Sequence, residues 1–375
     1  MKKILLAPDS FKGTMSSVEI CAIMKNAIET FYPDAEVISI PAADGGEGSV
    51  DAFLTALGGE KKTVSVQGPF GNKINSFFGI LENGTAIIEM AACAGLPLVK
   101  TEKNPATTTT YGAGELIKAA LDCGCDKIIM GIGGSATNDG GCGTASALGV
   151  QFFDKAGKAF IPTGGTLHHI ERIDKSGIDP RLKKIELITM CDIDNPLCGE
   201  NGAAYIFGPQ KGADSEMAAF LDSGLRHLAD VVKKEFALDM AETAGAGAAG
   251  GMGYGMKVFL DSSLRMGIET VLDTVNFNEL LKGADCVFSG EGTIDAQSLR
   301  GKVITGIARR TKAAHVPLIA VTGAIDDGID TLYDAGVTAL FCINRRADDF
   351  SRPGLCAQSN LSMTMKNILR LQKAF

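Results

Sequence analysis

KIIMGIGGSATNDGGCG, residues 127–143, carries the strongest structural signal in this chain. Its apolar start, Ile128-Ile129-Met130, has the length of a buried strand. Six glycines follow, with hydroxyl, amide and carboxylate side chains among them. Glycine costs backbone entropy, so this density indicates positive φ angles or a backbone that approaches a ligand closely. Because the alanine-rich residues 144–148 can continue as a helix, the stretch predicts an anion site at a helix N-terminus, with a tight structural turn as the alternative.

Strands and helices alternate at both ends of the chain, which predicts a parallel sheet with helical crossovers. Ser16 and Glu19 have the spacing of a capping box at the start of the first helix. The expected strands are 4–7, 36–40, 286–288, 318–321 and 339–343, and the expected helices are 16–28, 50–57 and 298–310.

The middle of the chain has a different character. Residues 63–66, 76–81 and 85–90 predict consecutive antiparallel strands, the last two joined by the hairpin signal Asn83-Gly84. Helices are expected at 107–122 and 217–234, a strand at 185–190, and a very flexible glycine and alanine tract at 244–255. We therefore expect an α/β fold in which residues 1–62 and 284–375 form a doubly wound parallel-sheet domain, and residues 63–283 an inserted second α/β domain with antiparallel strands.

Composition limits the classes of partner. The formal charge of −8 and the pI near 5.2 argue against nucleic acid, because no basic face offsets the acidity. The chain has no run of about 18 apolar residues, so no membrane span is expected. The ten cysteines are scattered without a CxxC motif, and the short apolar start before Pro8 does not resemble a signal peptide. These features predict a cytoplasmic protein with reduced, mostly buried thiols.

Six apolar strands run directly into polar loops, and ligands bind at the carboxyl ends of strands in open α/β sheets. The loops supply carboxylates, hydroxyls and glycine backbone, whereas all four histidines fall outside them. This inventory suits Mg²⁺ and phosphate, and it suits neither a zinc site nor a Ser-His-Asp hydrolase. The loops are 9–12, 44–48, 131–143, 192–196, 289–295 and 322–327.

Neither of the two common nucleotide-binding motifs, the GxGxxG fingerprint and the P-loop, is supported by this sequence. Residues 245–250 match GxGxxG, but residues 240–243 before them do not form a strand pattern, so a dinucleotide site is not indicated. A hinge, or backbone lying against a nucleotide, is the better interpretation. No P-loop motif is present, so an ATP site must be of another type. An NAD-dependent 2-hydroxy-acid oxidoreductase and a non-catalytic sensor of acidic metabolites are alternative classes, and abundant carboxylates argue against the sensor.

Six blocks together resemble the type-1 glycerate kinases, which are bacterial enzymes that phosphorylate glycerate with ATP. The resemblance covers nearly the whole chain. It implies a Rossmann-like domain with an inserted α/β domain, an active site in the cleft between them, Mg²⁺ as cofactor and 2-phosphoglycerate as product. A kinase for another small hydroxy acid or sugar acid is the nearest alternative. The blocks are PDSFKG (8–13), PAADGGEG (41–48), GIGGSATNDGG (131–141), CDIDNPLCGENGAAYIFGPQKGA (191–213), GAGAAGGMG (245–253) and SGEGTIDAQSLRGK (289–302).

Within this framework the two glycine-rich loops are expected to hold the ATP phosphates and the magnesium ion. Glu291 and Asp295 are the expected metal ligands, while helix capping by Asp139 and Asp295 is the alternative. Lys12, Lys211 and Lys302 are expected to be the cations of the site, Lys211 on the substrate, with solvated surface lysines as the alternative. The expected nucleotide contacts are Gly133, Gly134, Ser135, Thr137, Gly290 and Lys302.

A carboxylate of the Asp192-Ile193-Asp194 segment, Asp192 first, is expected to orient the glycerate hydroxyl and accept its proton. Asp9 and Asp44 are its rivals, since they close two other strands. The alternative is a carboxylate that only satisfies loop N–H groups. Lys12 and Asp9 complete the expected catalytic set, and Ser10 and Asp44 are expected to contact glycerate.

Overall fold

The structure is a computed structural model that describes residues 1–11, 13–43, 45–294, 303–345 and 356–374. The chain divides into two compact units. Unit 1 consists of residues 1–44, 51–58 and 266–375, and unit 2 of residues 45–50 and 59–265. The predicted domain bounds, 1–62 with 284–375 and 63–283, differ from these limits mainly at residues 266–283, and they stay a prediction.

Unit 1 has a five-stranded, wholly parallel sheet in the order β16-β14-β12-β1-β2. The order reverses beside β1, which makes the carboxyl ends of β1 and β12 the topological switch point of a doubly wound sheet. The strands are β1 (Lys3–Pro8), β2 (Glu36–Ser39), β12 (Cys286–Gly290), β14 (Leu318–Thr322) and β16 (Val337–Cys342), with a separate pair β13 (Thr293–Ile294) and β15 (Ala324–Ile325).

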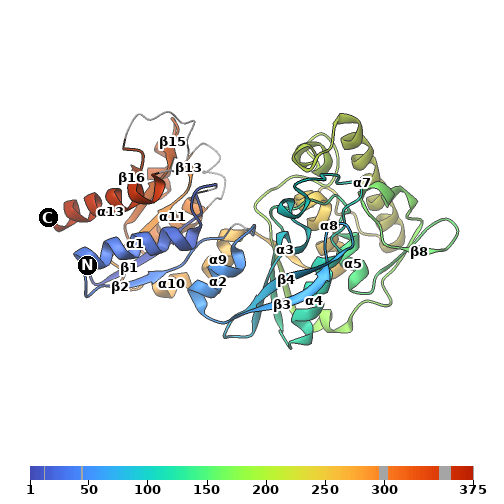
Figure 1. Cartoon of the computed structure of the whole chain (residues 1–375), viewed down its shortest axis with the longest axis horizontal. Helices are drawn as coiled ribbons and strands as arrows, with labels where there is room; N and C mark the ends of the chain where they lie inside the picture. The colour runs from blue at the N-terminus through green and yellow to red at the C-terminus, as the bar shows by residue number, and fades with distance from the viewer. Residues whose placement is uncertain (12, 44, 295–302, 346–355, 375) are drawn as a thin grey trace. The chain divides into compact units, whose positions relative to one another are not determined.

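Helices cover both faces of this sheet because its strands are apolar on both sides. Ile4 and Leu6 of β1 pack in one core with α1 (Ser17–Phe31) and α13 (Ala357–Lys373), two helices that lie against each other (Figure 1). Leu5, which points to the other face, is also fully buried. That face is covered by α11 (Val303–Ala313), which contacts β12 and β14. The other helices of unit 1 are α2 (Ser49–Leu57) from Asp51 on, α9 (Gly267–Thr274), α10 (Phe277–Leu280) and α12 (Asp330–Ala335).

Unit 2 has a six-stranded mixed sheet in the order β11-β10-β6-β5-β4-β3. Four neighbouring strands are parallel, and β4 runs antiparallel to both β3 and β5. The predicted Asn83-Gly84 hairpin joins β4 and β5, and the Leu81 N–H donates to the Thr85 carbonyl at 2.9 Å. The strands are β3 (Glu60–Gln67), β4 (Lys73–Ile80), β5 (Thr85–Glu89), β6 (Lys127–Gly131), β10 (Glu186–Met190) and β11 (Ser263–Arg265).

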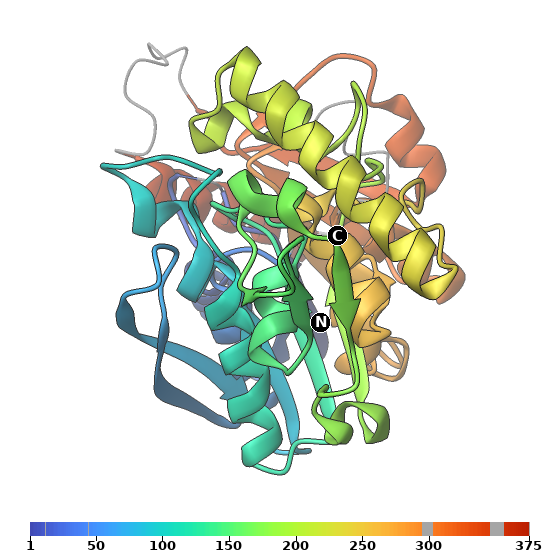
Figure 2. The same ribbon diagram turned by 90° about the vertical axis from the view of Figure 1, so that its right-hand side faces the viewer.

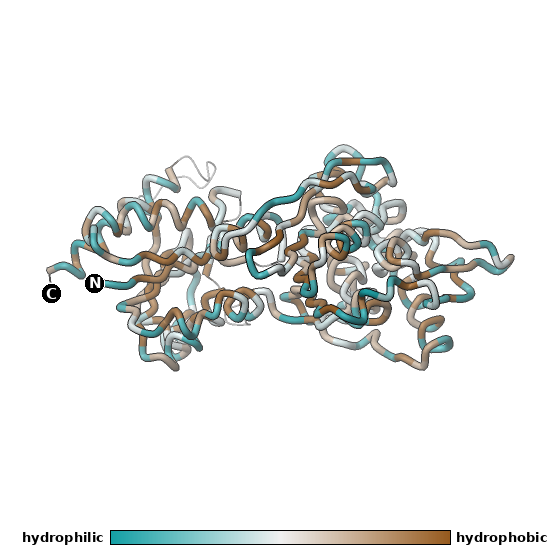
Figure 3. Tube along the Cα trace, turned by 90° about the horizontal axis from the view of Figure 1, so that it is seen from below, coloured by the Kyte–Doolittle hydropathy of each residue, from teal (hydrophilic) through white to brown (hydrophobic). Residues whose placement is uncertain are grey.

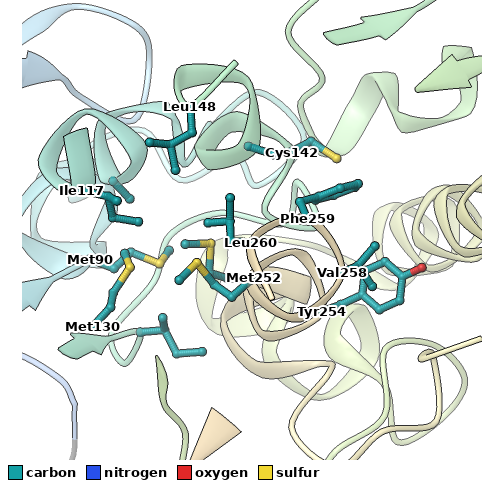
Figure 4. Packing of buried hydrophobic residues seen from close by; sticks show 14 of the residues in the cluster. Met90, Ile117, Met130, Cys142, Leu148, Met252, Tyr254, Val258, Phe259 and Leu260 are labelled. Atoms are coloured by element: carbon teal, nitrogen blue, oxygen red, sulfur yellow. The ribbon is translucent and has the colours of Figure 1, made fainter. Parts of the chain in front are cut away.

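One large core in unit 2 joins α4 (Tyr111–Asp122), α5 (Cys142–Ala147), α7 (Ser215–Phe236) and α8 (Ala248–Leu260) to this sheet (Figure 4). The 22-residue helix α7 is yellow-green in Figure 2. A small antiparallel sheet adds β8 (Ala159–Phe160), β7 (Gln151–Phe153) and β9 (Arg172–Asp174). The remaining segments are α3 (Ala91–Ala94), α6 (Ala203–Phe207), and the 3₁₀ turns η1 (Leu96–Val99), η2 (Gly164–His169), η3 (Pro180–Lys184) and η4 (Pro209–Lys211).

The predicted fold class is confirmed: a doubly wound parallel-sheet unit is interrupted by a second α/β unit that contains antiparallel strands. The prediction of a very flexible tract at residues 244–255 is wrong. Residues 248–260 form α8, which is kinked at residues 249–251, where φ is positive. Its Met252 and Tyr254 side chains are buried in the core (Figure 4), and Met256 is buried as well. The glycines in this tract allow close packing, since a Cβ atom at Gly251 would lie 2.9 Å from Gly140 Cα. The predicted capping box at Ser16 and Glu19 is confirmed.

Candidate active site

The glycine-rich loop after β6 uses several of its glycines against the chain's own backbone. A Cβ atom at Gly131 would lie 2.3 Å from the carbonyl oxygen of Gly45, and one at Gly133 would lie 2.9 Å from Gly46 Cα. The Gly133 N–H donates to the Gly45 carbonyl at 3.0 Å. Gly134 has a φ of +71°, a conformation that other residues adopt only with strain. Part of the glycine requirement in this loop is therefore structural.

Asp139 fills the helix N-terminus that the sequence predicted as an anion site. Its side chain is fully buried and accepts hydrogen bonds from four donors. The N–H and hydroxyl of Thr110 donate at 2.7 and 2.9 Å, and the N–H groups of Gly141 and Gly143 donate at 3.1 and 3.3 Å. Burial raises the pKa of Asp139, while these donors act in the opposite direction. Since every partner donates, the ionised carboxylate fits this position, and the predicted capping role of Asp139 is what the geometry shows.

Lys211, at the end of η4, lies against the same loop and is only 2% exposed. Its Nζ donates to Ser135 Oγ at 2.8 Å and to the Thr137 carbonyl at 2.7 Å. Burial lowers the pKa of Lys211 to about 7, against the opposing charge of Asp139. The structure thus brings together Lys211, Ser135 and Thr137, three residues that the sequence predicted for the site. Because Lys211 is buried, it is not a solvated surface lysine.

Two side chains of this loop are buried with polar atoms that have no hydrogen-bond partner among the described residues. They are the hydroxyl of Thr137 and both the oxygen and the nitrogen of the Asn138 amide. Each residue is 0% exposed. A buried polar group without a partner costs about 1–3 kcal/mol, so such groups mark places where a ligand or water belongs. Asn138 is not among the residues predicted for the site, although an amide between glycines after a strand is a usable signal.

In unit 1, the predicted residues Asp9, Ser10, Gly290 and Glu291 meet at the switch point. Pro8 pairs with Gly290 in the sheet, and the Asp9 N–H donates to the Gly290 carbonyl at 2.8 Å. The Ser10 N–H donates to Asp9 Oδ1 at 2.7 Å. A Cβ atom at Gly290 would lie 2.0 Å from the Val321 carbonyl oxygen, so strand packing by itself requires this glycine.

Glu291 is buried, and its Oε1 accepts a hydrogen bond from the Ile304 N–H at 3.1 Å. This contact places the carboxylate at the first turn of α11, where the helix dipole favours negative charge. The main chain is held as well, because the Thr322 hydroxyl donates to the Glu291 carbonyl at 2.8 Å. Glu291 therefore has a fixed position beside the switch point.

Asp192 lies two residues beyond the end of β10, which is the strand next to β6 in the sheet. The Asp192 side chain is exposed. Asp194 is exposed as well, whereas Cys191 between the strand and Asp192 is buried. Because Met190 pairs with Gly131, Asp192 follows the sheet edge from which the glycine-rich loop starts. The predicted residues Lys12, Asp44, Asp295 and Lys302 lie outside the described residues.

Two histidines of unit 2, His168 and His227, have structural roles. His168 Nε2 lies 2.8 Å from Ser223 Oγ, and His227 Nε2 lies 2.7 Å from the Ile170 carbonyl oxygen, so both rings tie the η2 segment to α7. Burial and the neighbouring histidines lower the pKa of His168. Within the part of the chain that the structure describes, no group of three or more His, Cys, Asp and Glu side chains could hold a metal ion by itself. None of the helices there is long and apolar enough to cross a membrane.

Comparison with known proteins assigns the family. A sequence profile described as "Glycerate kinase family" matches residues 4–373. The chain belongs to the glycerate kinase family. The glycerate kinase of Bacillus cereus is 44% identical over 373 residues, which cover 99% of this chain and 98% of that protein. The glycerate 2-kinase of Escherichia coli K12 is 43% identical, with 98% and 97% covered.

Structural comparison agrees with the sequence. The crystal structure of a presumed glycerate kinase 2 from Salmonella typhimurium LT2 has a TM-score of 0.87 and 39% sequence identity, and the match covers 100% of this chain and 99% of that one. The chain is therefore an enzyme of the kinase class, a phosphotransferase of the glycerate kinase family. The NAD-dependent alternative gains no support, because residues 240–243 before the GxGxxG match form turns rather than a strand.

Proposed function

We propose that this glycerate kinase transfers the γ-phosphoryl group of ATP to the 2-hydroxyl of D-glycerate in a magnesium-assisted, in-line reaction. The coarser activity, phosphorylation of glycerate, follows from the family. The name of the E. coli relative, glycerate 2-kinase, supports the choice of hydroxyl. Another small hydroxy acid as the acceptor is the alternative that the assay below tests.

The observation that carries the proposal is the chemistry at the carboxyl ends of the parallel strands. Asp9 and Glu291 directly follow β1 and β12, and β6 leads into the glycine-rich loop that Lys211 contacts. No histidine occurs at these strand ends in the described residues. Phosphoryl transfer needs positioning, charge stabilisation and a carboxylate that accepts a proton late, and these groups match those needs.

Glu291 fits the role of a magnesium ligand. It is a hard oxygen donor held in place beside the switch point, and Mg²⁺ in kinases is bound by one or two carboxylates together with substrate phosphates. When bound, the ion would neutralise charge on the transferring phosphoryl group. Asp295 remains the proposed second ligand. Gly133, Gly134, Ser135, Thr137, Gly290 and Lys302 remain the proposed nucleotide contacts.

The substrates under this proposal are small molecules, and the formal charge of −8 gives no basis for a nucleic-acid partner. A cytoplasmic location is part of the proposal. It is supported by the ten cysteines, all of which are free thiols in the structure.

The test is a coupled assay with purified enzyme. ADP should form only when ATP, D-glycerate and Mg²⁺ are all present, and EDTA should abolish its formation. Coupling to enolase alone identifies the product, because 2-phosphoglycerate is its direct substrate whereas 3-phosphoglycerate first needs a mutase. A signal that requires the mutase would overturn the 2-hydroxyl assignment, and ADP formation with other hydroxy acids in preference to glycerate would overturn the acceptor.

Asp192 is the proposed base, with Asp9 as its rival. Asp192→Asn keeps the size of the side chain but removes the proton acceptor, so kcat should fall at least about a hundredfold while ATP still binds. Asp9→Asn is the matched comparison at the end of β1. If Asp192→Asn keeps a near-normal kcat and Asp9→Asn does not, the base lies at the end of β1 instead.

A further inference from the structure

Lys211 is a buried amino group that makes no ion pair in the described part of the chain. Among the described residues no carboxylate oxygen lies within ion-pair distance of its Nζ, whose two acceptors are a hydroxyl and a carbonyl. Asp139 contributes a favourable charge, but its oxygens face the donors of Thr110, Gly141 and Gly143. An ammonium group in such surroundings gains much from an oxyanion ligand.

The unpaired atoms of Thr137 and Asn138 lie in the segment to which Lys211 donates. Asn138 offers both a donor and an acceptor, and Thr137 offers a hydroxyl. The fully ionised phosphates of ATP supply only acceptors and would leave Asn138 Oδ1 unpaired. A hydroxy carboxylate supplies acceptors through its carboxylate and a donor through its hydroxyl, so it matches the complete set.

The chain provides glycines on both sides of this cluster. Gly134 and Gly140, with φ of +71° and +63°, flank residues 135–139. Gly208 and Gly212 flank η4, and Gly212 has a φ of +97°. On its other side the segment is held tightly, because a Cβ atom at Gly250 would lie 2.0 Å from the Thr137 carbonyl oxygen. We therefore assign opening to the η4 side, where the two Lys211 hydrogen bonds must be exchanged and the bond from Lys103 Nζ to the Gln210 carbonyl must move with η4 or break.

We propose that Lys211, Thr137 and Asn138 form a closed subsite for the hydroxy-carboxylate acceptor, which opens at η4 and takes up a proton when the acceptor binds. The acceptor carboxylate replaces Ser135 Oγ and the Thr137 carbonyl on Lys211, and its hydroxyl pairs with Asn138. The inference rests on the proposed function. It assigns the Thr137 side chain to the acceptor instead of the nucleotide.

The proton balance is simple. Above neutral pH the free enzyme holds Lys211 largely as the amine, and the complex holds an ammonium–carboxylate pair, so one proton comes from the buffer. In the described part of the chain, the charged groups that contact or adjoin η4 include Asp139 in the glycine-rich loop, Lys103, whose Nζ donates to the Gln210 carbonyl at 3.1 Å, and Asp214 before the start of α7. Asp139 is the one whose charge reaches Lys211.

Titration calorimetry of the full-length enzyme with D-glycerate tests this proposal. Runs at about pH 8.5 in two buffers of different ionisation enthalpy should show uptake approaching one proton per site, and runs at about pH 6 should show little. Lys211→Arg, which stays protonated, should abolish the uptake. Parallel titrations with ATP and with inorganic phosphate should show none, and uptake in those arms without uptake for glycerate would overturn the acceptor assignment.

Asn138→Leu provides a second test that does not depend on Lys211. Removal of an unpaired buried amide should leave the melting temperature unchanged or raised, while KM for glycerate rises tenfold or more and KM for ATP stays within twofold. A glycerate KM within twofold of the wild type, together with no proton uptake at pH 8.5, would overturn the proposal. It would mean that water, rather than the acceptor, makes the missing hydrogen bonds to Thr137 and Asn138. If wild-type enzyme phosphorylates glycerate in that case, the proposed function stands and only this inference falls.

Discussion

Asp139 illustrates how a carboxylate can be accommodated in a protein interior. It is fully buried, and four donors from two segments, residues 110 and 141–143, converge on its two oxygens. These bonds replace hydration and fix the loop after β6 to the start of α4. The sequence could indicate Asp139 as a cap, because it precedes a helix, but the contribution of Thr110 depends on tertiary contact.

Asp139→Asn should lower the free energy of unfolding by about 3 kcal/mol or more, because the new amide turns an N–H group toward donors and its neutral oxygen accepts more weakly than a carboxylate. Asp154→Asn is the control, since Asp154 also accepts from backbone N–H groups, those of Ala156 and Lys158, but in an exposed turn. Urea unfolding followed by circular dichroism measures both. Equal losses of stability in the two variants would contradict the role assigned to the Asp139 donors.

Lys211→Met should stabilise the protein more at low pH than at high pH. The folded-state pKa of Lys211 is lowered to about 7 from an ordinary value of 10.5, so the unfolded chain binds this proton more strongly. Wild-type stability therefore rises with pH between these two values, and the burial penalty is fully present below about pH 7. Methionine removes that dependence, so the stability difference between variant and wild type should shrink by on the order of 2 kcal/mol from about pH 6 to about pH 9. Denaturant unfolding at the two pH values measures it, and a difference independent of pH would show that Lys211 keeps an ordinary pKa.

At the scale of elements, periodicity identified most of the strands and long helices, whereas packing partners could not be read from it. Residues 244–255 suggest flexibility by composition, yet in the structure they allow α8 to cross the glycine-rich loop without Cβ atoms between the backbones. The helix α13 was missed, although Leu361, Met365, Ile368 and Leu369 have helical spacing and are buried against β1 and α1. Its mixed polar and apolar character is visible in Figure 3.

The same distinction between local sequence pattern and long-range packing holds for the candidate site. The sequence placed Asp9 and Glu291 at strand ends correctly, because strand ends follow from local pattern. It could not show that Lys211 is enclosed or that Asn138 has unpaired atoms, since burial depends on segments far apart in the chain.

Gly255→Ala should destabilise unit 2 by a few kcal/mol, because its Cβ would lie 2.4 Å from the Gly140 carbonyl oxygen, where backbone must shift. Gly306→Ala in α11 is the matched helical control. The nearest atoms to its Cβ belong to side chains, those of Ile268 at 3.0 Å and Glu269 at 3.5 Å, and alanine favours the helix by about 1 kcal/mol. Thermal unfolding of both variants is the measurement, and a stable Gly255→Ala protein would mean that α8 does not need this close approach to the loop.

At the scale of the whole molecule, chain order matters as much as local pattern. Unit 1 is built from both ends of the chain, and β1 lies between β2 from the N-terminal segment and β12 from the C-terminal segment. Unit 2 is formed almost entirely by the continuous segment 59–265. Each unit has its own hydrophobic core, and the core of β1, α1 and α13 shares no residue with the core of α4, α5 and α8.

Separate cores predict that unfolding is not a single two-state transition. Leu369→Ala in α13 and Leu116→Ala in α4 remove fully buried side chains from the two cores, and each should cost about 2–5 kcal/mol locally. Hydrogen exchange followed by mass spectrometry should show lost protection in β1 and β12 for the first variant and in β5 and β6 for the second, with the other unit near wild type. The two variants control for each other, since both replace leucine in a helix that covers a sheet. Equal loss of protection in all four strands for either variant would mean that the units unfold as one cooperative body despite their separate cores.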